Sequence, residues 1–264
     1  MQTSLNTSEP PWYDRLWAAL IFFTRLPFWR LHQPPREAYE SVVEFWPLAG
    51  WLTAGVMAGV LYGASLLFSY ETAIVLAIVS RLLLTGALHE DGLADFFDGF
   101  GGGGRDRQRI LDIMKDSYIG TYGVLSLIAY FALLFCALHS LPPLAAVCSI
   151  LAIDPYAKMV SAQLIQLMPY ARTEETAKSK TVYRRFSVAA GIGLSVQGLL
   201  PMGLYLWWMH ERIDCTMLVF VPCLTMYFLY LLIWHRLRGY TGDCCGALFL
   251  LTELSAYLVI AHYL

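Results

Sequence analysis

The side chains with the clearest chemical potential concentrate in residues 89–120, which read HEDGLADFFDGFGGGGRDRQRILDIMKDSYIG within an otherwise apolar chain. Asp91, Asp95 and Asp98 are spaced i, i+4 and i+7 there, so a helix continuing through residues 85–98 places them on one face. Three carboxylates on one face repel one another unless a cation neutralises them, and oxygen ligands are the ones that Mg²⁺ prefers. We therefore predict that these three aspartates bind Mg²⁺.

Glycines and cations follow the acidic cluster directly. The run Gly101 to Gly104 would let backbone N–H groups approach a phosphate, and Arg105, Arg107, Arg109 and Lys115 would neutralise its charge. A carboxylate that does not bind the metal could then take the proton from an attacking hydroxyl. Taken separately, the glycine run is more often a flexible loop and the arginines a solvated turn. Together with the aspartates they predict direct displacement at phosphorus.

Composition places these residues in a membrane protein. The chain is 58% hydrophobic and 14% charged, with a mean hydropathy of +0.54, whereas soluble domains are nearer 45–50% apolar and about a quarter charged. Its 264 residues suffice for about six or seven spans of roughly 20 residues, which predicts one domain over residues 1–264. The net charge of −2 argues against nucleic acid as a partner.

The apolar runs predict an all-α polytopic integral membrane protein with about seven transmembrane helices. The spans that we expect are 45–68, 72–88, 119–138, 144–168, 187–209, 217–234 and 246–264. Residues 12–27 carry too many charges to span and predict an N-terminal interfacial amphipathic helix. Gly50, Gly55, Gly59 and Gly63 form a small-residue seam in the first span, which predicts close approach of another helix.

Three charged residues lie inside the predicted spans. Arg81 is expected to be paired or functional, because an unpaired charge facing lipid is costly. Asp154 and Lys158 are four residues apart and can pair with each other. For these two, an internal ion pair and a ligand-binding role are both open on sequence alone.

Basic residues alternate between the predicted loops. There are four Lys and Arg in the N-terminal arm, four after the second span, five after the fourth and two after the sixth, and only Arg212 between them. Under the positive-inside rule, the acidic cluster faces the cytoplasm.

Several stretches together resemble the cobalamin synthase family, also called adenosylcobinamide-GDP ribazoletransferase. HEDGLADFFDG, followed by GGGRDRQRILDIMKDSYIGTYG, is similar to the family's central signature. FFTRLP at residues 22–27, Tyr170-Ala171-Arg172, and GYTGDCCGA at residues 239–247 with Glu253 beyond it match its other motifs. The resemblance therefore runs nearly end to end.

The resemblance implies a reaction and its participants. A ribose hydroxyl of α-ribazole, or of its 5′-phosphate, would attack adenosylcobinamide-GDP at the corrinoid-side phosphorus and release GMP, with Mg²⁺ as cofactor. A lipid bilayer would surround the enzyme, and a homo-oligomer is left open. The site residues implied are catalytic Asp91, Asp95, Asp98 and Asp116, the first three also as metal ligands, and substrate-binding His89, Gly102, Arg105, Arg107, Lys115, Arg172 and Asp243.

The chain departs from the family pattern in three places. Glu90 replaces an apolar residue, the hinge PYARTEETAKSK lacks the usual glycines, and the usual Ser-Arg is absent near residues 153–155. A CDP-alcohol phosphatidyltransferase is the nearest alternative enzyme, although its motif spacing is missing. A transporter that uses its intramembrane charges is an alternative of another class.

Asp243 lies in the turn Gly-Tyr-Thr-Gly-Asp, far in sequence from the acidic cluster. We hypothesise that this turn folds over the cluster and that Asp243 contacts metal or substrate there. Asp is also a favoured helix cap, so N-capping of the last helix is the alternative.

Overall fold

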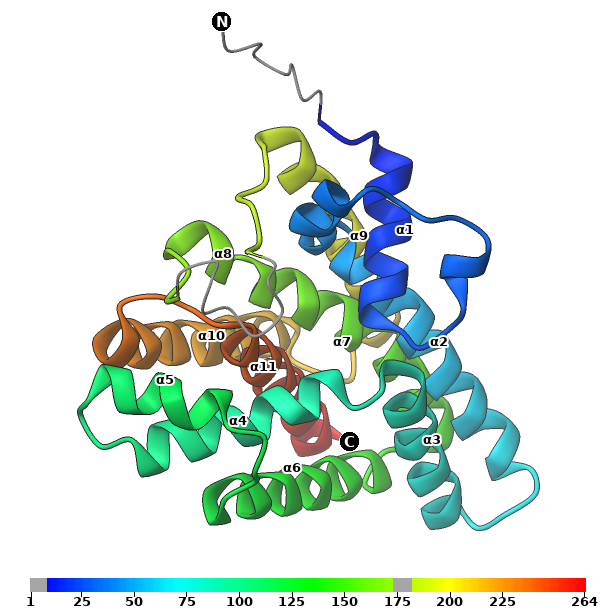
Figure 1. The fold of residues 1–264 in the computed structure, drawn as a ribbon. Helices are drawn as coiled ribbons and strands as arrows, with labels where there is room; N and C mark the ends of the chain where they lie inside the picture. Colours follow the sequence, from blue (N-terminus) through cyan, green and yellow to red (C-terminus); the bar gives the residue numbers. More distant parts are fainter. Residues whose placement is uncertain (1–8, 173–181) are drawn as a thin grey trace, which may run out of the picture.

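The computed structural model shows an all-helical bundle and describes residues 9–172 and 182–264 (Figure 1). Its elements are α1 (Trp12–Phe23), η1 (Phe28–Arg30), η2 (Arg36–Phe45), α2 (Trp46–Ser65), α3 (Tyr70–Thr85), α4 (Leu88–Gly102), α5 (Arg107–Lys115), α6 (Thr121–His139), α7 (Pro143–Ala162), α8 (Leu164–Leu167), α9 (Val188–Met209), α10 (Cys215–Leu237) and α11 (Gly242–Tyr263). The described ranges contain no β-strand, and their one β-type pairing is an isolated bridge between Tyr170 and Tyr240. The predicted all-α class is confirmed.

The number of apolar helices agrees with a multi-pass membrane protein. Over the described residues, 6 helices are long and apolar enough to cross a membrane, or up to 7 if α3 and α4 are counted as one bent span. The expected continuation of the second span into the acidic cluster is wrong, because α4 turns away from α3 by 89°. The three aspartates therefore lie on a helix of their own.

The break between α3 and α4 has a local cause. Gly86 and Ala87 both have positive φ, at 65° and 55°, which ends the α-helix. The Arg25 side chain lies where a Cβ on Gly86 would be, and the Arg25 N–H donates to the Leu84 carbonyl at 2.7 Å. The FFTRLP stretch thus packs against the point where the chain changes direction.

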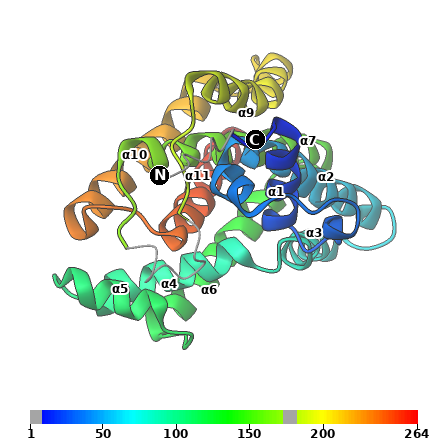
Figure 2. The same ribbon diagram turned by 45° about the horizontal axis from the view of Figure 1, so that its top comes forward.

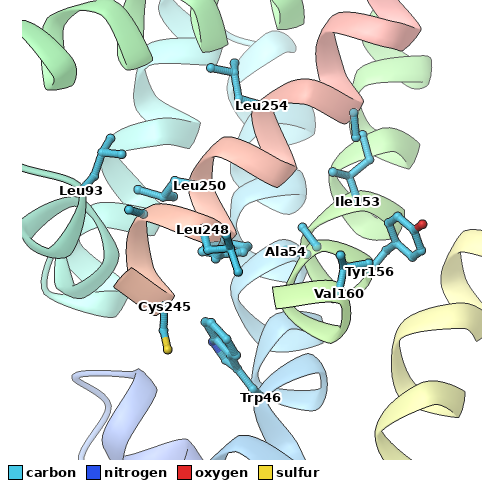
Figure 3. Packing of buried hydrophobic residues seen from close by; sticks show 14 of the residues in the cluster. Trp46, Ala54, Leu93, Ile153, Tyr156, Val160, Cys245, Leu248, Leu250 and Leu254 are labelled. Carbon is cyan, nitrogen blue, oxygen red and sulfur yellow. The ribbon is translucent and has the colours of Figure 1, made fainter. Parts of the chain in front are cut away.

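Helices α7 and α11 form the centre of the bundle. Each is 72% buried across its apolar stretch, against 22% for α9 and for α10, which present large apolar side chains outward. Leu248, Leu250 and Leu254 of α11 lie between Leu93 of α4 and Ile153 of α7 (Figure 3). Helices α4, α5 and α6 lie together on one side of the molecule, opposite α9 (Figure 2).

The expected glycine seam of α2 is confirmed at one position only. A Cβ on Gly50 would lie 2.7 Å from Asp154 Oδ1 of α7, whereas Gly55, Gly59 and Gly63 have no neighbour within 4 Å. Gly55 is five residues after Gly50, so the direction in which its side chain would point is rotated about the helix axis by roughly 140°. Gly55 and the later glycines therefore face away from α7.

Helix α1 ends earlier than the predicted interfacial segment. It stops at Phe23, and Thr24 is extended. Its charged residues have partners, since Asp14 contacts His32 at 2.5 Å and Arg15 contacts Glu44 at 2.5 Å. Its location at the membrane interface stays a prediction.

A buried ionic cluster joins α3, α6 and α11. Arg81 Nη1 donates to Glu253 Oε1 at 2.6 Å, and Arg81 Nη2 donates to the Tyr130 hydroxyl at 2.7 Å. Tyr130 in turn donates to Glu253 Oε2 at 3.1 Å. Glu90 of α4, which replaces an apolar residue of the family pattern, lies 3.8 Å from Arg81. The prediction that Arg81 is paired is confirmed.

The second intramembrane pair is also satisfied internally. Lys158 forms an ion pair with Asp154 and donates to Thr53 Oγ1 at 3.1 Å, and Thr53 donates to Asp154 Oδ2 at 3.0 Å. The Lys158 ammonium lies 4.2 Å from the centre of the Phe249 ring. The ion-pair interpretation of Asp154 and Lys158 is confirmed.

The substitution Arg81→Leu is expected to destabilise the fold by about 3–5 kcal/mol, because it leaves Glu253 buried without its cation. The measurement is thermal unfolding of the detergent-purified variant. Glu71→Gln is the control, since Glu71 pairs with His139 at the surface at 3.2 Å and the exposed pair is expected to contribute little to stability. Equal melting temperatures for the two variants would contradict the structural role of Arg81.

Candidate functional site

A pocket of about 260 Å³ opens where the first turns of α4 and α11 meet the end of α1 and the start of α2. It brings together four of the predicted site residues, His89, Asp91, Arg172 and Asp243. Its other lining residues are Phe22, Phe23, Val43, Trp46, Leu88, Gly92, Ile165, Tyr170, Tyr183, Thr241, Gly242, Cys245 and Gly246. Sequence motifs that are far apart thus contribute to one cavity.

Two glycines allow α4 and α11 to approach so closely. A Cβ on Gly92 would lie 3.1 Å from Asp243 Cα, and one on Gly246 would lie 3.1 Å from the His89 carbonyl oxygen. Both contacts are with backbone, which cannot move aside as a side chain could. The glycine after Asp91 and the glycine three residues after Asp243 therefore bring the two acids to one pocket.

Asp243 does not cap the last helix. The N-cap of α11 is Thr241, whose Oγ1 accepts the Cys244 N–H at 3.3 Å. Asp243 is the second residue of the helix and is buried, and its carboxylate accepts from the Thr241 hydroxyl at 3.3 Å. The capping alternative is wrong, and the expected packing of this turn over α4 is confirmed next to Asp91.

Asp98 faces a different neighbour. Its Oδ2 accepts the Gly120 N–H at 2.6 Å and its Oδ1 accepts the Gly123 N–H at 2.8 Å. These N–H groups belong to the N-cap and the first turn of α6, where an N–H has no carbonyl partner within the helix. The negative carboxylate also interacts favourably with the positive end of the α6 dipole. Asp98 therefore holds α6 against α4, and it is not among the residues that line the pocket.

The donor set around the pocket suits an ion that is shared with substrate. The described part of the chain has no group of three or more His, Cys, Asp or Glu residues placed to hold a metal. Mg²⁺ commonly uses one or two protein carboxylates and completes its shell with water and substrate phosphates. Asp91 and Asp243, which line one cavity, fit that pattern. The three-aspartate site, including half-buried Asp95, stays a prediction.

Much of the glycine run belongs to helix α4 and its C-terminal end. Helix α4 continues to Gly102, and the Gly103 N–H donates to the Gly99 carbonyl at 2.9 Å. A Cβ on Gly99 would lie 2.7 Å from Met114 Cγ, and one on Gly103 would lie 2.8 Å from Ile110 Cα. These glycines let α5 pack closely on α4, and the expectation of N–H groups pointing at a phosphate is wrong for Gly103.

The predicted cations divide between two roles. Arg107 donates to the carbonyls of Leu237 at 2.7 Å and Ala171 at 2.6 Å, which ties α5 to the end of α10 and to the residue between Tyr170 and Arg172. Arg172 lines the pocket and donates to the Leu111 carbonyl at 2.8 Å. The structure leaves the remaining predicted residues exposed and outside the pocket lining: Gly102, Arg105, Lys115 and Asp116. Lys178 and Lys180 of the altered hinge lie outside the described residues.

Aromatic residues outside the predicted set of site residues complete the pocket. Trp46, Tyr170 and Tyr183 line it, and burial followed by the charge of Asp243 raises the pKa of Tyr170 to about 12. The Tyr170 phenol therefore stays protonated and serves as a neutral hydrogen-bonding group. The Tyr-Ala-Arg motif was the sequence signal for Tyr170. Nothing in the sequence around Trp46 marks Trp46 as a pocket residue.

Comparison with known proteins agrees with the motifs. Residues 15–261 match the sequence profile of the family described as cobalamin-5-phosphate synthase. A protein of Vibrio cholerae named adenosylcobinamide-GDP ribazoletransferase is 34% identical over 247 residues, which cover 93% of this chain and 92% of the relative. Proteins of the same name from Leptospira interrogans (30% identical, 97% of each chain) and Shewanella frigidimarina (34% identical, 96% of this chain and 97% of the relative) are also similar. No solved structure matches.

Gly123→Ala is expected to destabilise the protein by about 1–3 kcal/mol, because the added methyl overlaps the Asp98 carboxylate and the Ala94 carbonyl. Gly55→Ala is the matched control, since a Cβ there meets nothing within 4 Å. Thermal unfolding of both purified variants measures the difference. A Gly123→Ala protein as stable as the control would show that Asp98 does not hold α6 in place.

Proposed function

Since the chain belongs to the cobalamin-5-phosphate synthase family, we propose that the pocket between α4 and α11 is where it joins α-ribazole, or α-ribazole 5′-phosphate, to adenosylcobinamide-GDP. The observation that carries this proposal is the convergence of Asp91, Arg172 and Asp243 on one cavity. Two carboxylates and a guanidinium are the groups that transfer at phosphorus needs, for the attacking hydroxyl and for the phosphate charge.

The reaction is a displacement at phosphorus. A ribose hydroxyl of the acceptor attacks the corrinoid-side phosphorus of adenosylcobinamide-GDP, and a new O–P bond forms. The bond from that phosphorus to the bridging oxygen breaks, and the electron pair leaves with GMP. The proton of the attacking hydroxyl passes to a carboxylate of the pocket.

Asp91 and Asp243 are the residues that would hold Mg²⁺ together with phosphate oxygens of the substrate. The ion would supply charge neutralisation at the phosphates. If only one of the two carboxylates held the ion, the other would take the proton of the attacking hydroxyl. Arg172 adds a fixed positive charge to the same cavity, and protonated Tyr170 offers a neutral hydrogen bond.

The intramembrane charges do not support a transporter. Arg81 is bound by Glu253 and Tyr130, and Lys158 is bound by Asp154 and Thr53. Each cation therefore has its partners within the protein, and removing them for a passing substrate would leave a buried charge uncompensated. These pairs support a structural role in the bundle.

The orientation that we propose places the pocket at the cytoplasmic face of the bacterial inner membrane. The α4–α5 turn with Arg105 and the segment with Arg184 and Arg185 carry the basic residues that the positive-inside rule retains in the cytoplasm. The turn between α9 and α10, with the single cation Arg212, would face outward.

Asp91→Asn and Asp243→Asn are each expected to lower turnover by roughly a hundredfold to a thousandfold, because each removes a carboxylate that would hold Mg²⁺ or take the proton of the attacking hydroxyl. The assay follows product formation by purified protein with Mg²⁺ and both substrates. Asp112→Asn on the exposed face of α5 is the matched control and is expected to be near wild type. Normal turnover in a folded Asp91 variant would remove the pocket from the reaction.

Arg105→Cys is expected to react with an impermeant thiol reagent from the cytoplasmic side only, and Glu211→Cys from the opposite side only. Both positions are exposed in turns, so accessibility is not limited by packing. The exposed Cys136 and Cys223 are replaced by serine in the parent protein. Reversed labelling would overturn the proposed orientation.

A further inference from the structure

We infer that the aromatic side of the pocket binds the base of the acceptor nucleoside, and that His89 recognises this base through a single hydrogen bond to a ring nitrogen. The inference rests on the proposed function and adds to it which substrate lies in the pocket and which residue selects it. The base in question is an apolar fused two-ring system with one hydrogen-bonding nitrogen, as in α-ribazole.

Three rings from three helices make up this side of the pocket. Phe23 of α1 and Trp46 of α2 stack with centroids 5.5 Å apart and an interplanar angle of 11°. His89 of α4 stacks on both, at 6.2 Å and 10° from Phe23 and at 5.9 Å and 16° from Trp46. All three line the cavity. Near-parallel rings favour a flat aromatic guest, because offset stacking adds to the burial of apolar area.

Two polar atoms in this wall lack a hydrogen-bond partner among the described residues. They are His89 Nε2 and Trp46 Nε1, in side chains that are only 4% and 2% exposed. A buried N–H group without an acceptor is costly, and such groups are few in folded proteins. With its proton on Nε2, His89 donates, so a ring nitrogen of a bound base would satisfy it. An orphaned donor beside a stacking surface is what recognition of a heteroaromatic base requires.

The size and polarity of the cavity indicate which part of the two substrates can bind in it. Its volume of about 260 Å³ lies below the roughly 300–1,000 Å³ of pockets for drug-sized ligands, so a corrin macrocycle does not fit. Guanine carries several donors and acceptors along its edges, and the apolar neighbours Phe22, Val43 and Ile165 would leave most of them unpaired. A base with one free ring nitrogen leaves none unpaired. The nucleoside's ribose then remains in the cavity that holds Asp91 and Asp243.

The test compares two ribosides that differ in one atom. Benzimidazole riboside has the ring nitrogen, and indole riboside has a C–H group in its place. Binding of each to the purified, detergent-solubilised protein is measured by calorimetry without the second substrate. Wild type is expected to bind the benzimidazole riboside about tenfold more tightly, the value of one buried hydrogen bond. The preference should disappear in His89→Phe, which keeps the stack, and persist in His89→Gln, which keeps an N–H donor.

His139→Phe is the matched control. His139 also stacks on aromatic rings, at 5.7 Å from Phe135 and 6.0 Å from Tyr70, but it is not among the pocket residues. This variant should keep the tenfold preference.

Equal affinity of wild type for the two ribosides overturns the inference, whether or not the His89 variants fold. Weaker binding of GMP by His89→Phe with unchanged riboside binding also overturns it, because the pocket would then hold guanine. These measurements need no turnover. Failure of the proposed function would instead appear as a wild-type protein that binds the ribosides and forms no product.

Discussion

The backbone contact between α4 and α11 is the constraint on which the functional part of this protein depends. Gly92 lies against Asp243, and Gly246 lies against His89, so neither helix could carry a side chain at its glycine without moving the other. This crossing places an acid from each helix beside one cavity. The two motifs that contain these glycines are thus a single packing unit as well as the source of the reactive groups.

The acids of α4 differ in role because they point in different directions from one helix. Asp91 lines the pocket, Glu90 lies 3.8 Å from Arg81 of α3, and Asp98 binds the first turn of α6. Helix α4 is therefore held by charged contacts to two neighbours while it presents a carboxylate to the cavity. In a low-dielectric interior such contacts are costly to break, which gives the pocket rigid walls.

Two glycines and one arginine of residues 89–120 act by packing and by backbone hydrogen bonds. The glycines at positions 99 and 103 allow Met114 and Ile110 of α5 to pack closely on α4. Arg107 donates to the backbone carbonyls of Leu237 and Ala171. Glycine and arginine are also the residue types that bind phosphates, so their presence beside an acidic cluster suggested a binding loop. Residue type alone does not distinguish an N–H group that meets a phosphate from one that is already bonded within a helix.

Apolar run length and motifs were enough to predict the helical membrane class, most of the spans and the family. The helical repeat showed only that Asp154 and Lys158 could pair, and the structure then showed that they do. Three features could be seen only in the folded protein: Gly86 and Ala87 turn α4 away from α3 by 89°, Thr241 rather than Asp243 caps α11, and His89 stacks on Trp46. The reason is physical: helix periodicity gives the face on which a residue lies within its own element. The neighbour that this face meets depends on how the helices cross, and crossing is set by contacts between residues distant in the chain.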